Sequence, residues 1–497
     1  MKKYIYLLAL FSLPSFAEPW VDTSNIFLRA NIQHLADLGM IKTPTTTYPL
    51  MWINIVNDLK KAPITALDEK AQSSYNYVMH QFKLAKNNQK TIELNTSLKD
   101  KRFTSFGDSF REKNNIGIRT SWMTDSFALN LSTSYNHSDD GKIRYDGSYI
   151  ATFVGNWVAT IGMQDRWWGN GWDSNLSLTN NARPMPTISL TRKESLPFII
   201  PFTDYGIPWT VTSFMGMMDD DRVIKDTLLW GFRLNFKPFD NLEIGITRLA
   251  QWGGEGRPKD ASTFWNVLIG KDNCGAGGLD CSGEVSQEPG NQQAGYDLRY
   301  TFNAFDTPFS LYGQYYAEDG DNHSSFGFLT EPVTLIGLDT HIRPFNKPST
   351  MYFEFSDTYA DCTDTNNIDT GDCFNEHHTY ATGMRYEQRT IGHIYDNDAK
   401  AMVLGIISEL QTDTHMELKL RKLSLNYDNS DKAPSNPIVG NPLTAIAEDM
   451  ITLSAKIQHS YRNWRFTLGS EYSQSSFDND ISDDSDFNAF LNIEYNL

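Results

Sequence analysis

The chain has 497 residues, a net charge of −18 at pH 7 and a mean hydropathy of −0.44. This acidic balance argues against nucleic acid as a partner, because nucleic-acid binding requires a basic surface. Beyond residue 17, no apolar run reaches the roughly 20 residues of a membrane-spanning helix. If the mature chain spans a membrane, it must therefore do so with strands that close into a barrel.

Residues 1–17 have the features of an export signal. Lys2 and Lys3 give a positive start, an apolar run follows up to Leu13, and Ser15-Phe16-Ala17 has the small-x-small form of a cleavage site. The apolar run is too short to cross a membrane as a helix. We therefore predict that residues 1–17 are a signal peptide that the mature protein lacks.

Residues 18–90 predict three short amphipathic helices. Gly39 is placed to end the first, and Asp68 to open the third. The apolar residues recur at helical spacing, at Leu28, Ile32, Leu35 and Leu38, at Met51, Ile55 and Leu59, and at Leu67, Ala71, Tyr75, Val78, Phe82 and Ala85. Such helices bury little by themselves, so we expect residues 18–90 to form a plug at the periplasmic mouth of a barrel. A small independent helical domain is the alternative.

Residues 91–497 alternate apolar and polar side chains, as half-buried strands do. The last strand illustrates this, with Leu491, Ile493, Tyr495 and Leu497 on one face. Nineteen candidate strands lie near 91–99, 115–123, 126–136, 143–154, 156–164, 184–192, 209–217, 227–237, 241–251, 293–302, 309–318, 333–343, 350–360, 379–389, 400–411, 415–427, 449–461, 463–474 and 486–497. Bacterial single-chain barrels have even strand numbers. We therefore predict an all-β transmembrane barrel of about 18 antiparallel strands, with one candidate being a loop segment or half of a divided strand.

The segments between strands predict the orientation of the barrel. Short turns such as 238–241 and 344–348 should face the periplasm, whereas the long links should face outward or fold into the lumen. The long links are 165–183, 253–292, 361–378 and 428–448. Trp464, Phe466, Leu468 and Tyr472 alternate with polar residues and give the aromatic-flanked apolar band of a lipid-facing strand.

The four cysteines occur as two local pairs, Cys274 with Cys281 and Cys362 with Cys373, in loops rich in Gly, Asp and Asn. An exported chain with cysteines paired in this way favours two disulfides. A zinc site is the competing interpretation, but the spacing is not C-x-x-C and no histidine pair lies in register.

The densest group of candidate binding residues lies in the link after the fifth candidate strand. It contains Arg166, Trp167, Trp168, Trp172 and Asp173, followed by Asn181 and Arg183. Indole faces stack on the apolar faces of sugar rings, and charged or amide side chains bind the hydroxyl groups. The alternative is that this link packs inside the barrel, with Trp filling volume and Arg pairing with Asp.

A second candidate group comprises Asp219, Arg222 and Arg257. Acidic tracts near 364–372 and 478–486 leave weak calcium binding open, but their spacing does not match a calcium loop. The chain shows no Gly-x-Ser-x-Gly, His-Glu-x-x-His or phosphate-binding loop motif. We therefore expect no enzyme, no cofactor and no metal site.

Several of these segments resemble the Wzi family of outer-membrane capsule assembly proteins. The likeness includes residues 20–23, 28–30, 45–52, 208–209, 228–231 and 251–258, and it is densest in residues 163–173 and 179–190. The resemblance implies an 18-stranded barrel closed on the periplasmic side by an N-terminal helical bundle. It also implies a lectin-like role in holding capsular polysaccharide at the cell surface.

These observations together predict an outer-membrane protein of a Gram-negative bacterium that binds capsular or extracellular polysaccharide. Its other partner would be the outer-membrane lipid, and we expect a monomer. A diffusion porin is the first alternative, and an outer-membrane hydrolase acting on glycan or lipid is the second.

Overall fold

The structure is a computed structural model that describes residues 18–63, 67–87, 90–108, 111–137, 141–271, 289–318, 332–360, 362–363, 369–370, 373–430, 432–433, 436–478 and 483–497. The predicted signal peptide, residues 1–17, lies outside these residues, as do Cys274 and Cys281.

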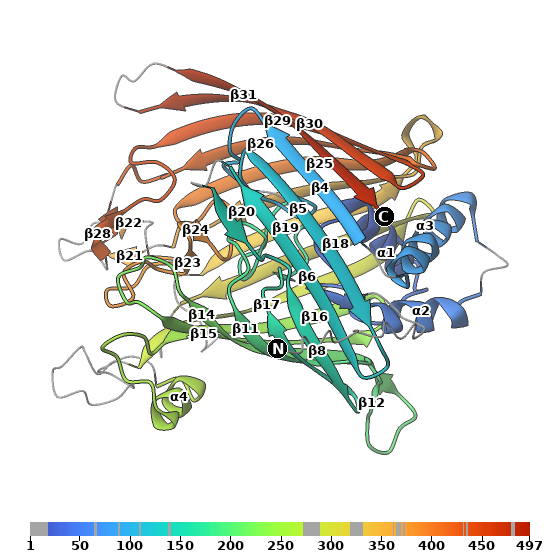
Figure 1. Ribbon diagram of the computed structural model, residues 1–497, viewed down its shortest axis with the longest axis horizontal. Helices are drawn as coiled ribbons and strands as arrows, with labels where there is room; N and C mark the ends of the chain where they lie inside the picture. Colours follow the sequence, from blue (N-terminus) through green and yellow to red (C-terminus); the bar gives the residue numbers. More distant parts are fainter. Residues whose placement is uncertain are drawn as a thin grey trace, which may run out of the picture.

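Antiparallel strands, paired in chain order, close into one barrel (Figure 1). The strands are β4 (Lys90–Ser97), β5 (Asn114–Met123), β6 (Phe127–Asn136), β7 (Lys142–Arg144), β8 (Tyr149–Val154), β9 (Trp157–Gly162), β11 (Thr187–Arg192), β14 (Trp209–Met218), β15 (Thr227–Phe239), β16 (Leu242–Trp252), β17 (Gly290–Ala304), β18 (Thr307–Ala317), β19 (Val333–Ile342), β20 (Ser349–Asp357), β25 (Ala399–Gln411), β26 (Thr414–Leu425), β29 (Glu448–Tyr461), β30 (Trp464–Phe477) and β31 (Asp484–Asn496). β7 and β8 pair with successive parts of β6 and share one strand position, so the barrel has 18 positions, as predicted. The last strand, β31, pairs with β4 and closes it.

One predicted strand, near 379–389, is wrong. These residues form a small hairpin of β23 (Arg385–Tyr386) and β24 (Arg389–Thr390) outside the barrel sheet. The backbone turns at Glu387 and Gln388, where φ is 47° and 65°. Arg385 holds the hairpin within its own loop, since its guanidinium pairs with Glu376 at 2.6 Å and with Asp396 at 2.7 Å. The alternation of apolar and polar residues near 379–389 therefore reflects packing of the hairpin within its loop, and not a strand of the barrel.

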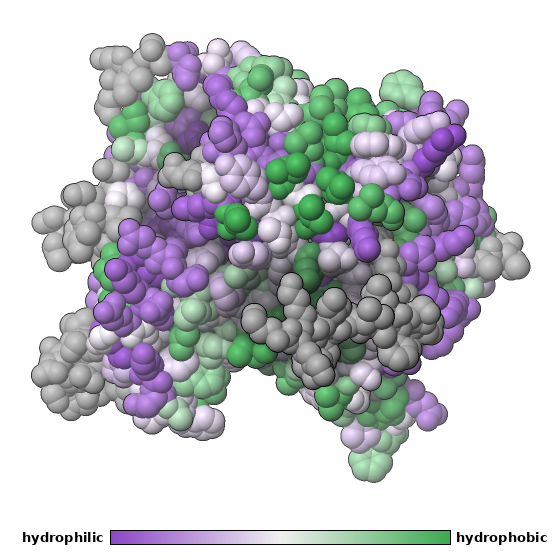
Figure 2. Space-filling view, in the orientation of Figure 1, coloured by the Kyte–Doolittle hydropathy of each residue, from purple (hydrophilic) through white to green (hydrophobic). Residues whose placement is uncertain are grey.

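The outer face of the barrel wall is apolar. Ile118, Ile161, Ile188, Ile336, Leu453 and Leu468 are among its exposed side chains, whereas their sequence neighbours point into the lumen. Figure 2 shows apolar surface over the middle of the barrel and polar surface toward its two ends. This is the arrangement of a strand-built membrane protein. Among the described helices, none is long and apolar enough to cross a membrane.

Three helices form the N-terminal part of the chain, as predicted: α1 (Ile26–Asp37), α2 (Trp52–Lys61) and α3 (Glu69–Ala85). The side chain of Asp68 caps α3 by accepting from the Ala71 amide at 2.7 Å. Short strands β1 (Trp20–Val21) and β3 (Leu50–Met51) pair with each other beside the helices. A further helix, α4 (Ala261–Leu268), lies within one of the long links and was not predicted.

The helices lie at the barrel end that carries the short turns (Figure 1). Lys70 of α3 donates to the Ser349 carbonyl at 3.0 Å, and Ser73 donates to Glu409 at 2.6 Å. In bacterial barrels the short turns face the periplasm. The opposite end carries α4 and the hairpins β21 (Cys362–Thr363) with β22 (Asp369–Thr370) and β27 (Lys432–Ala433) with β28 (Asn436–Gly440).

A buried ion-pair group joins α1 to the barrel wall. The carboxylate of Asp37 accepts from Arg299 on β17 and from His341 on β19, both at 2.8 Å. Arg299 also pairs with Asp339 at 2.6 Å. Burial by itself would raise the pKa of Asp37, but Arg299 and His341 hold it below its ordinary value of 3.8. The carboxylate is therefore charged at neutral pH and ties the helix to the wall.

The first prediction concerns the lipid-facing surface. Leu468 lies mid-strand on β30, with its side chain 61% exposed on the outer face. Leu468→Arg should lower the free energy of unfolding in phospholipid vesicles by about 2–4 kcal/mol, because it places a charge among acyl chains. Ile143→Arg, at the long-loop end of the wall, should cost about 0–1 kcal/mol. Equal costs at the two positions would show that Leu468 does not face the membrane interior.

The second prediction concerns the attachment of α1. Asp37→Asn should destabilise the protein by about 3 kcal/mol, because it removes one partner of a buried ion pair, and it should speed hydrogen exchange in α1. Glu69→Gln is the matched control, since its pair with Arg343 is exposed and should contribute less than about 1 kcal/mol.

The same substitution should change the pH dependence of stability. Because the folded-state pKa of Asp37 is depressed, its contribution is present above pH 3.8 and is lost as the pH falls below that value. Asp37→Asn should therefore lose less stability than the wild type between about pH 5 and about pH 2. An identical loss in both proteins would contradict this assignment.

Candidate functional site

The link between β9 and β11, which contains most of the predicted site residues, folds into the lumen. Its residues 166–185 are buried, and Trp167 and Trp168 form β10 (Trp167–Trp168), which pairs with β2 (Thr47–Tyr48) of the N-terminal segment. The indole of Trp167 donates to the Gly171 carbonyl at 3.0 Å, and Trp168 packs edge-on against Phe214 at 5.4 Å. This link and the N-terminal segment therefore form one packed body.

Trp172 and Asp173 attach this body to the opposite wall. The Trp172 indole donates to Asp339 at 2.8 Å, and its ring stacks on Tyr352 at 5.7 Å. Asp173 accepts from Arg421 at 2.8 Å, from Lys419 at 3.1 Å and from the Tyr395 hydroxyl at 2.6 Å. Burial opposes ionisation of Asp173, but the two cations lower its pKa overall.

Aromatic rings surround the guanidinium of Arg29, which α1 extends toward the link. The central carbon of this guanidinium lies 4.5 Å from the ring centre of Trp172, 4.6 Å from that of Phe106 and 5.6 Å from that of Trp167. Arg29 also donates to the Gly171 carbonyl at 2.7 Å. The three predicted sugar-stacking tryptophans are thus 0–2% exposed, with no free face for a sugar ring, and this geometry supports the alternative that they fill the lumen.

Arg183 lies in a different setting, in a charged group at the long-loop end. Its guanidinium contacts three carboxylates from separate loops, those of Glu112, Asp146 and Glu387. Arg144 also pairs with Glu387, at 2.7 Å. The carboxylate side chains are 16–29% exposed, so they remain open to solvent. We call Arg183, Glu112, Asp146 and Glu387 the Arg183 cluster.

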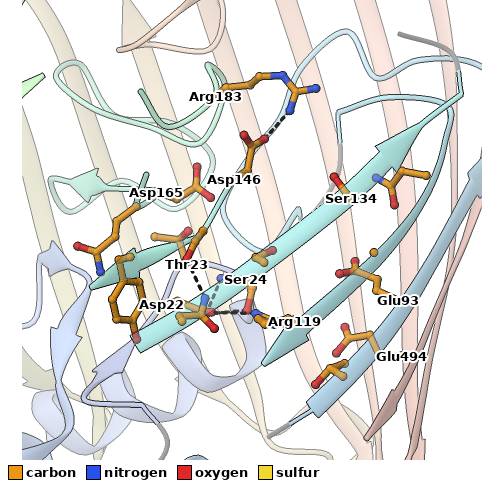
Figure 3. Close-up of a pocket in the computed structure, with 18 of the residues that line it drawn as sticks. Asp22, Thr23, Ser24, Glu93, Arg119, Ser134, Asp146, Asp165, Arg183 and Glu494 are labelled. Carbon is orange, nitrogen blue, oxygen red and sulfur yellow. Dashed lines mark hydrogen bonds and ion pairs between the residues drawn. The ribbon is translucent and has the colours of Figure 1, made fainter. Parts of the chain in front are cut away.

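A polar cavity of about 170 Å³ lies beside the Arg183 cluster, between the N-terminal segment and the wall of β31, β4, β5 and β6 (Figure 3). In Figure 3, Arg183 and Asp146 lie at one end of the cavity and Asp22 and Arg119 at the other. At roughly 30 Å³ per water, it could hold about six waters. Small side chains such as Ser132 and Ser134 on β6 create this space.

Carboxylates, amides and two aromatic rings line the cavity. Trp20 and Tyr149 pack edge-to-face at 5.0 Å on one side. Asn130 is buried, and its side-chain oxygen has no hydrogen-bond partner among the described residues. Burial raises the pKa of Glu18 to about 7 and also raises the pKa of Asp165. Such walls, with hydrogen-bonding groups of both kinds beside aromatic surface, suit a hydroxyl-rich ligand.

The predicted residue Arg166 lies on the other side of the same link. It lines a smaller cavity of about 40 Å³, together with Gln164, Asp165 and Arg183. Its guanidinium donates to Thr187 at 3.1 Å. Asn181 ties loops together, because its amide oxygen accepts from the Thr104 amide at 3.2 Å. Of the densest predicted group, the structure therefore brings Arg166 and Arg183 to a cavity.

The residues of the second predicted group contact the β23–β24 hairpin and do not line a cavity described above. Asp219 accepts from the Tyr386 hydroxyl at 2.5 Å, and Arg222 donates to the carbonyls of Gly383 and Arg385, both at 3.2 Å. Arg257 lies 5.6 Å from the Tyr380 ring centre. These contacts hold the β23–β24 hairpin in the mouth of the barrel, so we do not include the three residues in the candidate site.

Neither predicted disulfide lies wholly within the described residues. The side chain of Cys362 lies outside the described residues, as do Cys274 and Cys281, so both disulfides stay predictions.

In the part of the chain that the structure describes, one group has potential metal ligands, Asp37, Asp339 and His341. The guanidinium of Arg299 already pairs with both of its carboxylates.

The sequence pattern did not predict the carboxylates of the Arg183 cluster. Glu112, Asp146 and Glu387 lie in three loops far apart in the chain, and each looks like an ordinary solvated acid. Arg111 was also missed; it donates to the carbonyls of Asn180 and Ala182 at 2.6 and 2.9 Å and to Asp165 at 3.0 Å. The one usable signal was Arg183 itself, a charged residue within a link rich in aromatic residues.

Known proteins resemble this chain in sequence and in fold. A Klebsiella pneumoniae protein, described as an uncharacterized 55.8 kDa protein in the cps region, is 28% identical over 346 residues, which are 67% of this chain and 64% of that protein. The chain thus matches less than two thirds of that relative's length.

The solved structure of Wzi from Escherichia coli has the same fold. Wzi is described as an outer-membrane carbohydrate-binding β-barrel involved in group 1 capsule assembly. The two structures superpose with a TM-score of 0.79 and 22% identity, covering 96% of this chain and 99% of Wzi. In addition, the family model of the capsule assembly protein Wzi matches residues 84–489. The chain is a β-barrel that belongs to the Wzi family of capsule assembly proteins.

Proposed function

We propose that this protein binds a capsular or other extracellular polysaccharide at the outer end of a plugged barrel. It would help to assemble the polysaccharide or hold it at the cell surface, without catalysing a reaction on it. The Arg183 cluster is the observation that carries this proposal, because it combines a guanidinium with half-buried carboxylates at the long-loop end. The fold shared with a carbohydrate-binding barrel supports it.

The adjoining cavity suggests how the polysaccharide would be held. Its volume of about 170 Å³ lies below the roughly 300–1,000 Å³ of typical ligand pockets. It would therefore take one sugar residue or a substituent, with the rest of the polymer lying across the loops. Charge-assisted hydrogen bonds from the cluster would supply most of the specificity.

In the same proposal, residues 18–90 act as the periplasmic plug, and a diffusion porin is the less supported alternative. The lumen contains a core of buried residues from α1, α3 and the tryptophan-bearing link, packed against Tyr312, Tyr352 and other wall residues. We expect small single-channel conductance in planar bilayers. Porin-like conductance with no polysaccharide binding would favour the alternative.

The third prediction tests the Arg183 cluster. Arg183→Lys keeps the positive charge but loses the planar fork that reaches several carboxylates at once. We expect a roughly tenfold or greater loss of affinity for polysaccharide from the protein's own host, measured by calorimetry with purified protein. Heat-modifiable gel mobility should show that the barrel still assembles.

Arg343→Lys is the matched control, because Arg343 lies at the turn end and pairs with exposed Glu69. It should bind polysaccharide as the wild type does. Wild-type affinity of assembled Arg183→Lys would place the binding site elsewhere, beginning with the loops that contain residues 253–292 and 361–378. Release of reducing ends during the assay would instead indicate a hydrolase.

The fourth prediction separates packing from binding. Trp172→Ala should lower stability by about 3–5 kcal/mol, because it removes a large buried side chain. The protein that does assemble should retain polysaccharide normally. If assembled Trp172→Ala releases polysaccharide at unchanged stability, Trp172 contacts the glycan, as the sequence first indicated.

A further inference from the structure

An apolar hairpin projects from the turn end of the barrel, between β11 and β14. Its strands are β12 (Phe198–Ile199) and β13 (Gly206–Ile207), which pair in antiparallel register. Residues 196–199 and 201–205 are exposed. The hairpin extends past the ends of the neighbouring strands at the lower right of Figure 1, and apolar side chains gather at that corner in Figure 2.

Both faces of this hairpin are apolar. Phe198 and Ile199 are adjacent in β12 and so point to opposite faces, yet both are more than half exposed. At the tip, Phe202 is fully exposed, with φ at 66°, a conformation that bulky residues rarely adopt. Asp204 is the single charged residue between positions 196 and 208. A docked protein would cover one face, whereas a lipid phase would cover both faces and the tip.

The backbone of the hairpin also suits a poorly hydrated setting. Pro197, Pro201 and Pro208 have no amide hydrogen to leave unsatisfied. The Ile200 amide donates to the Tyr205 carbonyl at 2.9 Å, and the Tyr205 hydroxyl donates to the Pro238 carbonyl. The second of these bonds ties the projecting hairpin to the end of β15, at the rim of the barrel.

The base of the hairpin joins the lipid-facing wall directly. Ile188 and Leu190 on the outer face of β11 lead into it. Arg192 braces the base by donating to the carbonyls of Trp209 and Leu196 at 2.7 and 3.0 Å, with its guanidinium 3.8 Å from the Trp209 ring centre. Two other turns at this end have Phe305 and Phe345 at their tips. These two side chains are also almost fully exposed, and both residues have positive φ.

We propose that the β12–β13 hairpin is a membrane-binding foot, which lies in the headgroup–acyl boundary of the inner leaflet and contacts phospholipid on both faces. Apolar elements of this kind lie about 5–10 Å deep in that boundary, where water still reaches the free strand edges. Arg192 and Lys193 at the base would lie at the level of phospholipid phosphates. The foot would fix the depth and tilt of the barrel, and it is independent of polysaccharide binding.

Site-specific photo-crosslinking tests this proposal. The photoreactive residue p-benzoylphenylalanine would replace Phe198, Ile199 or Phe202, one at a time. Assembled protein would be irradiated both in vesicles of phosphatidylethanolamine and phosphatidylglycerol and in intact cells. Ile188 on the outer wall is the lipid-facing control, and exposed Lys60 on α2 is the aqueous control.

We expect lipid adducts at all three hairpin positions, in both settings, at a yield similar to that at Ile188, and none at Lys60. Lipid adducts on one face alone, a protein adduct in cells at any of the three positions, or a lipid yield as low as that at Lys60 would each overturn the proposal. Because Phe198 and Phe202 exchange one aromatic side chain for another, these two positions can be scored without disturbing the hairpin.

Discussion

A closed barrel with charged side chains pointing inward must supply each of them with a partner, and this constraint governs the structure. The inner wall carries Arg233, Arg299, Glu354 and Arg421, all buried. A buried charge is costly unless it is paired and hydrogen-bonded. Part of the pairing comes from within the wall, as between Arg233 and Asp297 at 2.7 Å. The other partners come from segments folded into the lumen. The barrel wall, the N-terminal helices and the link between β9 and β11 therefore stabilise one another.

This mutual dependence separates the lumen into a fixed part and an open part. Glu354 illustrates the fixed part, since it accepts from the amides of Trp172 and Asp173 and from the Tyr312 hydroxyl. Along β4, β5 and β6, smaller inward side chains leave the cavity of about 170 Å³. A ligand site at the edge of such a rigid body is preorganised, because its guanidinium and carboxylates are already held in place.

The sequence predicted the repeating parts of the fold well, because alternation and helical spacing are local properties. All 18 barrel positions and all three N-terminal helices were found in this way. The strand predicted near 379–389 was wrong. Its apolar residues do alternate, but they pack within a loop that the ion pairs of Arg385 hold together. The candidate site was harder to predict. Residue type pointed to Trp167, Trp168 and Trp172, but exposure depends on which loops enter the lumen, and Glu112, Asp146 and Glu387 meet only in three dimensions.

In this account the polysaccharide binds at the Arg183 cluster and its cavity. Hydrogen exchange of the wild-type protein, with and without oligosaccharides from the host polysaccharide, tests it most directly. We expect protection in residues 111–118, 141–149 and 163–166, which surround the cluster and cavity, and none in the turns at the opposite end. Binding with protection confined to other loops, and none in these three segments, would contradict the account.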